Sequence, residues 1–439
     1  MYNFLKKDLF LFILLLIPFS FVLGIFITEI FVLSLTLFFF FTNKNYSYLK
    51  DKKFLFFIII SIYVAINGFI QVNDDFSKNL LISSIFYFRF IFFSFSIFFI
   101  LKLMQNRIIM YEKYILIPIV IFFSFLFFDI FFQYLNGTNL LGFEIINNRI
   151  SSIFGTELIL GSFLIKVTLI SIILINLINH ELIKKKKILF ISFLSLVLIS
   201  TYLSGERTSF SLFLILSFLV IIFIKTLRKS FFISLLILTC FIIITAQVDL
   251  GKSDPYNRIF LKTFNQITNN YFIKNKSKGI DKDPKTITKK ILKNSKIFSS
   301  DHNGHFILAY QLFKSNTIFG IGPKGFRHYC RKVEYNPKIG ICSTHPHNYL
   351  VQIITELGLV GFLLYFFALS FLIIKLIHCR KMEIDLKKKE IFSLISIGLL
   401  VNLFPFLPSG NFFNNWLSII NFYLFGIYLY SYKQVFAND

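Results

Sequence analysis

The sequence is poor in charged residues, and in acidic ones above all. Charged side chains make up 15% of the 439 residues, and 22 Asp and Glu stand against 46 Lys and Arg. A soluble globular domain carries about 25% charged residues, so this scarcity, together with a mean hydropathy of +0.72, excludes the soluble class. No small-residue cleavage site follows the first apolar segment, and we expect that segment to stay in the membrane as an anchor.

Cysteine is also scarce, and none of the four cysteines shows the spacing of a structural zinc site. Cys240 and Cys379 lie at or near apolar segments, where we expect them to fill small apolar spaces. Cys330 and Cys342 lie in a long polar segment predicted outside the membrane, where disulfides persist. We expect these two to form a disulfide that closes a small loop just ahead of a histidine cluster.

Long apolar runs dominate the sequence, and 56% of its residues are hydrophobic. A bilayer core of roughly 30 Å needs about 20 apolar residues per helix, and hydropathy predicts helices near 9–25, 28–42, 54–70, 80–101, 115–135, 158–179, 188–204, 208–224, 231–248, 348–374, 391–407 and 412–430. The predicted fold is therefore an all-α integral membrane protein with about twelve transmembrane helices. The run Leu9–Phe41 is long for one span and short for two, and Glu29 near its middle favours a tight turn between two.

The charge pattern predicts the orientation. Basic residues in short loops mark the cytoplasmic side of a membrane protein. With both termini cytoplasmic, 23 Lys and Arg lie in inner segments, and the short outer loops hold Lys78, Arg149 and Arg207. The predicted parts are a bundle of about nine helices over 1–248, a large, partly helical extracytoplasmic loop over 249–346, and about three helices over 347–439.

The large loop is strongly basic, with 18 Lys or Arg against six Asp or Glu. Its stretch Lys274–Lys296 is low in apolar residues and is predicted to be disordered. Farther on, Phe306, Ala309, Tyr310 and Phe313 recur at helical spacing and predict an amphipathic helix lying over the bundle. The positive charge suits an anionic headgroup, a pyrophosphate or an acidic sugar.

The loop ends with two motifs that could carry chemistry. Gly320-Ile321-Gly322-Pro323 is a turn signal with no strand before it, which argues against a nucleotide-binding glycine loop. His345-Pro346-His347-Asn348 lies where the chain re-enters the membrane. A histidine there is partly desolvated yet reachable, as a general base near neutral pH must be. The alternative for His347 is a packed, structural histidine.

These motifs resemble the bacterial O-antigen ligase and O-antigen polymerase superfamily. The resemblance rests on His347-Asn348 followed by nine residues, Gly358, two residues and Gly361, with Gly320-x-Gly322 upstream. Two further segments, 149–155 and 204–208, are similar to that family, as is the topology with one large outer loop. The resemblance implies a GT-C-like fold and a metal-independent, inverting glycosyl transfer from undecaprenyl diphosphate, with no cofactor.

The resemblance also implies roles for single residues. His347 would be the general base, with His345 orienting it or meeting substrate, and Asn348, Gly320 and Gly322 would lie at the substrate site. Arg207 would hold the diphosphate; the alternative is an arginine that reaches the membrane interface.

A second diphosphate ligand is harder to assign. The family carries a loop arginine some twenty residues before Gly-x-Gly, where this chain has His302 and His305. Arg258 or Arg327 would supply the charge, or a histidine would replace it. Arg149 lines the same cavity or is a plain surface residue.

The acceptor separates the possible functions. A ligase transfers the glycan to lipid A–core, a polymerase to another carrier-linked glycan, and a third relative to protein. We favour the ligase, acting at the periplasmic face of the inner membrane. The alternative from another class is a transporter or flippase of lipid-linked saccharides, but two similar six-helix halves are not visible in the sequence.

Overall fold

The computed structural model describes residues 2–42, 52–70, 78–105, 108–248, 250–265, 300–330 and 342–436. These ranges are helical nearly throughout and contain three isolated bridges but no strand. The stretch Lys274–Lys296, predicted to be disordered, lies outside the described residues.

Each of the twelve predicted apolar segments is occupied by helix. The first nine correspond to α1 (Tyr2–Ser20), α2 (Ile25–Thr42), α3 (Lys52–Ile70), α4 (Lys78–Ile85) with α5 (Phe88–Met104), α6 (Glu112–Asn136), α7 (Leu160–Ile178), α9 (Lys187–Leu203), α10 (Arg207–Phe223) and α11 (Lys225–Gln247). The last three are α16 (Tyr349–Lys381), α17 (Leu386–Asn402) and α18 (Asn415–Val435). Hydropathy did not predict the short α8 (His180–Lys185) and α15 (Phe326–Tyr329).

Two predicted boundaries differ from the structure. The segment 80–101 is split by a turn at Phe86 and Tyr87 into α4 and α5. The run Leu9–Phe41 does form two helices, but it breaks ahead of Glu29, at a 3-10 turn (Phe21–Leu23) followed by Gly24. Gly24 has a φ of 112°, which L side chains rarely adopt, so the glycine rather than the acid sets the break.

The chain is an all-helical membrane protein. Among the described residues, five segments are long and apolar enough to cross a bilayer: Ile25–Thr42, Ile108–Asn136, Leu160–Ile178, Lys225–Gln247 and Tyr349–Lys381. Four shorter apolar helices accompany them, at Asp8–Leu23, Ile58–Phe69, Lys187–Leu203 and Arg207–Phe223. Helix α7 is buried over almost its whole length, and it packs against α9, α10 and α17 to form the centre of the bundle.

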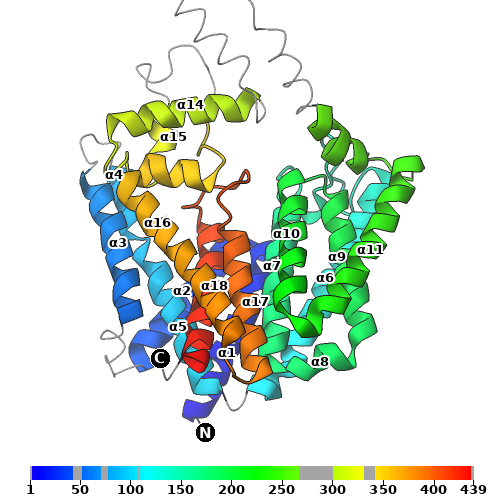
Figure 1. Cartoon of the computed structure of the whole chain (residues 1–439), viewed down its shortest axis with the longest axis horizontal. Coiled ribbons are helices and arrows are strands. Elements are labelled where there is room, and N and C mark those ends of the chain that lie inside the picture. The colour runs from blue at the N-terminus through cyan, green and yellow to red at the C-terminus, as the bar shows by residue number, and fades with distance from the viewer. Residues whose placement is uncertain are drawn as a thin grey trace, which may run out of the picture.

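Both termini lie at one end of the bundle, and α14 (Ser300–Ser315) lies across the other (Figure 1). Helix α16 is kinked at Gly358, where φ is 66° and ψ is −164°. Its first part extends sideways beneath α14 and α15, and the rest descends into the bundle (Figure 1). The end that carries α14 is called the α14 end below.

Helix α14 contains the predicted amphipathic segment, but it buries a different face. His305, Leu308, Ala309 and Leu312 are buried, whereas Tyr310 is 57% exposed. The buried side chains pack against a cluster of Ile321, Phe326 and Cys330. The predicted buried face is therefore displaced by one residue along the helix. The reason is that α14 packs on the segment that follows it in the same chain, around Ile321, Phe326 and Cys330.

Candidate active site

The glycine turn and the kink of α16 are joined through their backbones. Ile321 donates its N–H to the carbonyl oxygen of Thr355 at 3.1 Å, and Gly322 donates to that of Glu356 at 2.9 Å. In return, Leu359 donates to the carbonyl oxygen of Thr317 at 3.0 Å. These bonds satisfy backbone groups that the kink removes from the helix ladder.

Glycine is required on both sides of this junction. A Cβ on Gly320 would lie 2.5 Å from the amide nitrogen of Gly358, and a Cβ on Gly358 would clash with the carbonyl of Ile318. Both glycines also have positive φ, 75° and 66°. The spacing between Gly320 and Gly358 in the sequence therefore encodes a contact between two backbones.

The carboxylate of Glu356 completes the junction. It is fully buried and accepts the backbone N–H groups of Lys324 and Phe326, each at 3.1 Å, and the amide of Gln352 at 2.9 Å. Sequence reasoning did not assign Glu356 to the site. It fixes the turn at 322–326 against α16.

His347 lies at the start of the sideways part of α16. Its φ of 57° is unusual for a non-glycine residue, and its carbonyl oxygen accepts the N–H of Ser409 at 2.9 Å. Asn348 caps α16 by accepting the N–H of Val351 at 3.0 Å. Its amide donates to the carbonyl of Pro405 at 2.9 Å. Asn348, predicted to bind substrate, is thus buried with its side chain engaged by the protein.

Both ring nitrogens of His345 have partners. Nε2 donates to the carbonyl oxygen of Ser409 at 3.1 Å, which leaves Nδ1 to accept the hydroxyl of Thr344 at 2.9 Å. Burial, followed by the positive potential of neighbouring His347, lowers the pKa of His345 to about 3. This ring is therefore neutral at physiological pH and is held in one tautomer.

Three histidines meet at this point. The ring of His347 lies 4.1 Å from that of His345 and 5.2 Å from that of His305, measured between centroids. His305 and His345 are buried, and His347 is half-buried, which makes it the most accessible of the three. The side chain of His302 lies outside the described residues. Arg327, on α15, is half-buried and contributes positive potential at His345.

A disulfide joins Cys330 and Cys342, the pair expected to be oxidised, with their Cα atoms 5.4 Å apart. Cys330 follows α15 and is buried against α14. Cys342 is three residues before His345. The bond therefore ties the histidine segment to the helices that cover it.

An arginine cluster forms a second part of the α14 end. Arg207 begins α10, and its Nε donates to the carbonyl oxygen of Arg258 at 2.9 Å. Arg258 donates in turn to the carbonyls of Gly205 and Asn147, both at 2.9 Å. Gly205 has a φ of 68°, and a Cβ there would lie 2.9 Å from Cδ of Arg258. Glycine at this position lets the arginine approach.

Glu206 organises the cluster, although sequence reasoning did not single it out. Its carboxylate accepts the N–H groups of Gly161 and Ser162 at 3.0 and 3.1 Å, at the start of α7. It also pairs with Nη2 of Arg149 at 3.2 Å and accepts the hydroxyl of Ser209 at 2.8 Å. The carboxylate thereby fixes Arg149 between α7 and α10.

Arg149 and Arg258 line an open, polar pocket together with Lys252 and Lys262. Burial, then the positive potential of neighbouring Arg149 and Arg207, lowers the pKa of Arg258 to about 10, which leaves Arg258 cationic at neutral pH. The two lysines were not predicted as site residues. A pocket with this charge is suited to a phosphate-type anion.

The loop 403–414, between α17 and α18, separates the two clusters at the α14 end (Figure 1). On one side it holds His345 and His347 through Ser409. Directly after it, the ring of Trp416 lies 5.6 Å from Nζ of Lys166. Loop 403–414 was not predicted to belong to the site.

Two charges inside predicted spans have protein partners. Arg89 forms an ion pair with Glu29 through two hydrogen bonds, from Nη2 at 2.9 Å and from Nε at 3.2 Å. Lys166 donates to the hydroxyl of Ser162 at 2.8 Å and is 6% exposed.

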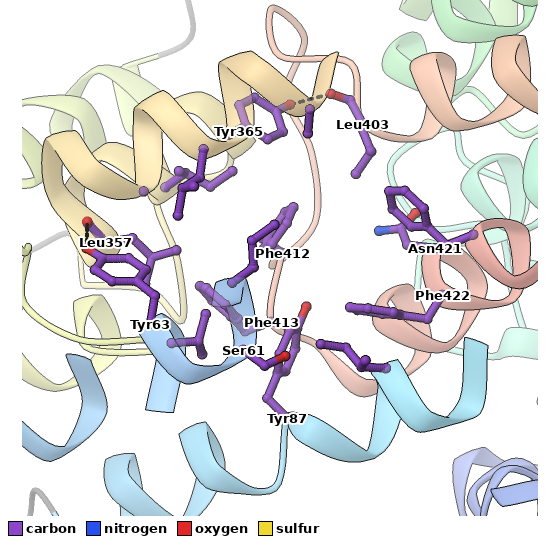
Figure 2. Close-up of a pocket in the computed structure, with 18 residues that line it drawn as sticks. Ser61, Tyr63, Tyr87, Leu357, Tyr365, Leu403, Phe412, Phe413, Asn421 and Phe422 are labelled. Carbon is purple, nitrogen blue, oxygen red and sulfur yellow. Dashed lines mark hydrogen bonds between the residues drawn. The ribbon is translucent and has the colours of Figure 1, made fainter. Parts of the chain in front are cut away.

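An apolar pocket lies beneath the kink of α16, between α3, α5, α16 and α18 (Figure 2). Its cavity volume is about 110 Å³, and it is lined largely by aromatic and aliphatic side chains. Tyr63 donates to the carbonyl of Leu357 and Tyr365 to that of Leu403 at its edges. No group of three His, Cys, Asp or Glu within the described ranges has the arrangement to hold a metal ion.

Comparison with known proteins supports the superfamily predicted from the motifs. No curated protein matches the sequence. Residues 190–366 match the family model described as O-antigen ligase, and this range contains Arg207, Arg258, the three histidines and the glycine junction. Arg149 precedes it. This match to residues 190–366 supports the O-antigen ligase and O-antigen polymerase superfamily that the sequence motifs resemble.

Proposed function

We propose that this protein transfers a glycan from undecaprenyl diphosphate to a sugar of lipid A–core, as an O-antigen ligase of the bacterial inner membrane. The observation that carries the proposal is the placement of a half-buried histidine, His347, and of a cationic pocket at the same end of a membrane bundle. The basic inner segments predict that this α14 end faces the periplasm and that both termini are cytoplasmic.

His347 acts as the general base. It takes the proton of the acceptor hydroxyl while the oxygen attacks the anomeric carbon and the bond to the diphosphate breaks, which inverts the configuration. His345 is neutral and bound to Ser409 and Thr344, so we assign it the role of positioning its neighbour. The junction of Gly320 with Gly358 sets the direction in which α16 presents His347.

Arg207, Arg258 and Arg149 hold the donor diphosphate. Negative charge develops on the diphosphate as its bond to the sugar breaks, and guanidinium groups stabilise that charge through charge-assisted hydrogen bonds. Lys252 and Lys262 add positive charge at the rim of the same pocket. A donor activated by its diphosphate needs no metal ion. The apolar pocket beneath α16 is suited to the hydrocarbon of a lipid-linked substrate.

A complementation experiment tests this function. A strain that lacks the gene receives the wild type, His347→Ala or Arg207→Ala, with His378→Ala and Arg228→Ala as matched controls near the opposite end of the bundle. Membrane levels of each variant are measured beside the surface polysaccharide ladder and the pool of undecaprenyl-linked glycan. We expect both site variants to lose the ladder and to accumulate lipid-linked glycan, and both controls to behave as the wild type.

The length of the accumulated glycan distinguishes the acceptors. Long chains left on the carrier indicate a ligase, and single repeat units indicate a polymerase. A normal ladder in the His347→Ala strain contradicts the assignment of the base. An accumulation of glycan on the cytoplasmic side supports transport in its place.

A further inference from the structure

Two cations lie in the glycine turn and in α15, and neither lines the cationic pocket around Arg258. Lys324 ends the glycine turn and Arg327 belongs to α15, and both side chains are half-buried. Arg327 contributes positive potential at His345, whose ring lies 4.1 Å from that of His347. Arg327 therefore lies near the histidines, and Lys324 is close enough to Arg327 to feel its positive potential. The cationic pocket for the donor is instead built around Arg258.

The nearby carboxylates are already engaged. Glu356 accepts the backbone N–H groups of Lys324 and Phe326. Glu29 accepts hydrogen bonds from Nε and Nη2 of Arg89. Within the described residues, neither Lys324 nor Arg327 forms an ion pair, and the buried Nε of Arg327 has no hydrogen-bond partner. Among the described residues, these two half-buried cations thus have no ion-pair partner, although Glu356 and Glu29 contribute negative potential at Lys324.

The backbone holds Lys324 in this position. Its φ of 62° is in the left-handed region, and its N–H is bound to the carboxylate of Glu356 at 3.1 Å. Burial, then the positive potential of Arg327 and Arg89, lowers the pKa of the lysine. A bound anion would offset this repulsion, since half-buried charges are stabilised by a partner of opposite sign.

We propose that Lys324 and Arg327 bind an anionic group of the acceptor, a phosphate ester close to the hydroxyl that His347 deprotonates. This inference rests on the proposed transfer to a lipid-linked acceptor, and it names the feature by which that acceptor is selected. The phosphate would orient the sugar so that its hydroxyl faces the histidine. A headgroup of an anionic membrane lipid has the same chemistry and is the other possible source of the phosphate.

The test uses the purified full chain in nanodiscs, with undecaprenyl-diphosphate-linked glycan as donor. The acceptor is lipid A–core, either intact or treated to remove its phosphates. Initial rates give the acceptor KM, the donor KM and kcat for the wild type, Lys324→Gln and Arg327→Gln. Arg327→Lys keeps the charge. Lys314→Gln is the matched control, because Lys314 is exposed on α14 and lies over the ring of Tyr310 at 4.7 Å.

We expect each neutral variant to raise the KM for intact acceptor about 10-fold or more, as for a lost charged hydrogen bond. The donor KM should stay unchanged, and Arg327→Lys should recover most of the loss. With dephosphorylated acceptor, the wild type should bind as weakly as the variants, and Lys314→Gln should behave as the wild type in both assays.

Other results overturn the inference. An equal loss with intact and dephosphorylated acceptor excludes recognition of an acceptor phosphate. A changed donor KM assigns the two cations to the donor. An effect that appears in nanodiscs of anionic lipid and vanishes in zwitterionic lipid assigns the site to a membrane headgroup. If the wild type transfers glycan to neither acceptor, the proposed function itself fails, which is a distinct outcome.

Discussion

The backbones of Gly320 and Gly358 are in direct contact, although 38 positions separate them in the sequence. A Cβ on Gly320 would lie 2.5 Å from the amide nitrogen of Gly358. The contact joins the turn after α14 to the kink of α16, and it sets the direction of the helix that begins after His347. The glycine spacing is thus a structural requirement of the site, since no side chain fits between the two segments.

Alanine at Gly358 should separate the turn from the helix. We expect Gly358→Ala to reach the membrane but to reduce glycan transfer at least about 10-fold, because the added methyl meets the carbonyl of Ile318 and the residue must keep a positive φ. Gly142→Ala is the matched control, as Gly142 also has a positive φ, 83°, but has open space around its Cβ position. Equal losses in the two variants would mean that backbone strain alone accounts for the effect.

We expect the disulfide between Cys330 and Cys342 to stabilise the position of the histidine segment 345–347. A loop of this size, closed between Cys330 and Cys342, restricts the unfolded chain by about 3 kcal/mol in the chain-entropy estimate. We expect Cys342→Ser to lower the melting temperature and to reduce transfer, and mild reduction of the wild type to do the same. Cys240→Ser, which changes an exposed free thiol, is the control. Unchanged transfer after complete reduction would show that the bond does not order the site.

His345 makes the stability depend on pH. The pKa of His345 in the folded protein is about 3, below the ordinary value of 6.5. Between these two pH values the ring is protonated in the unfolded chain and neutral in the folded protein. The contribution to stability is complete above pH 6.5 and is lost as the pH falls from 6.5 towards 3, by about 1.4 kcal/mol per pH unit. We expect acid to destabilise His345→Gln less than the wild type.

Thermal melts of purified protein between pH 7.5 and 5.0 measure this difference. His378→Gln serves as the control, because His378 is exposed and lies near the opposite end of the bundle. Parallel pH dependence of the wild type and His345→Gln would exclude a depressed pKa at this ring.

The sequence predicted the helices well, and it predicted the site residues by type rather than by arrangement. Hydropathy located the helices because a bilayer demands long apolar runs. It misplaced the buried face of α14, since Leu308 and Leu312 pack on the loop of the same chain. Glu206 and Glu356 were missed because each binds backbone N–H groups, and such bonds leave no pattern of residue types.

The position of Arg258 is a second example of a contact that the sequence pattern does not reveal. Its contact with Arg207 joins residues 51 positions apart, and no spacing rule predicts it. The pairing of Arg89 with Glu29 is also set by the packing of α2 on α5. Long-range contacts of this kind follow from the fold, and they decide which of several candidate arginines share a site.

The most direct test of the central claim is the transfer reaction with purified protein. Wild type and His347→Ala, each as the full chain in nanodiscs, receive undecaprenyl-diphosphate-linked glycan and lipid A–core, and product is measured over time. A general base contributes about 100-fold or more to the rate. We therefore predict that wild type forms the ligated product and that His347→Ala is at least about 100-fold slower with its donor KM unchanged. Transfer by His347→Ala at the wild-type rate would contradict the account.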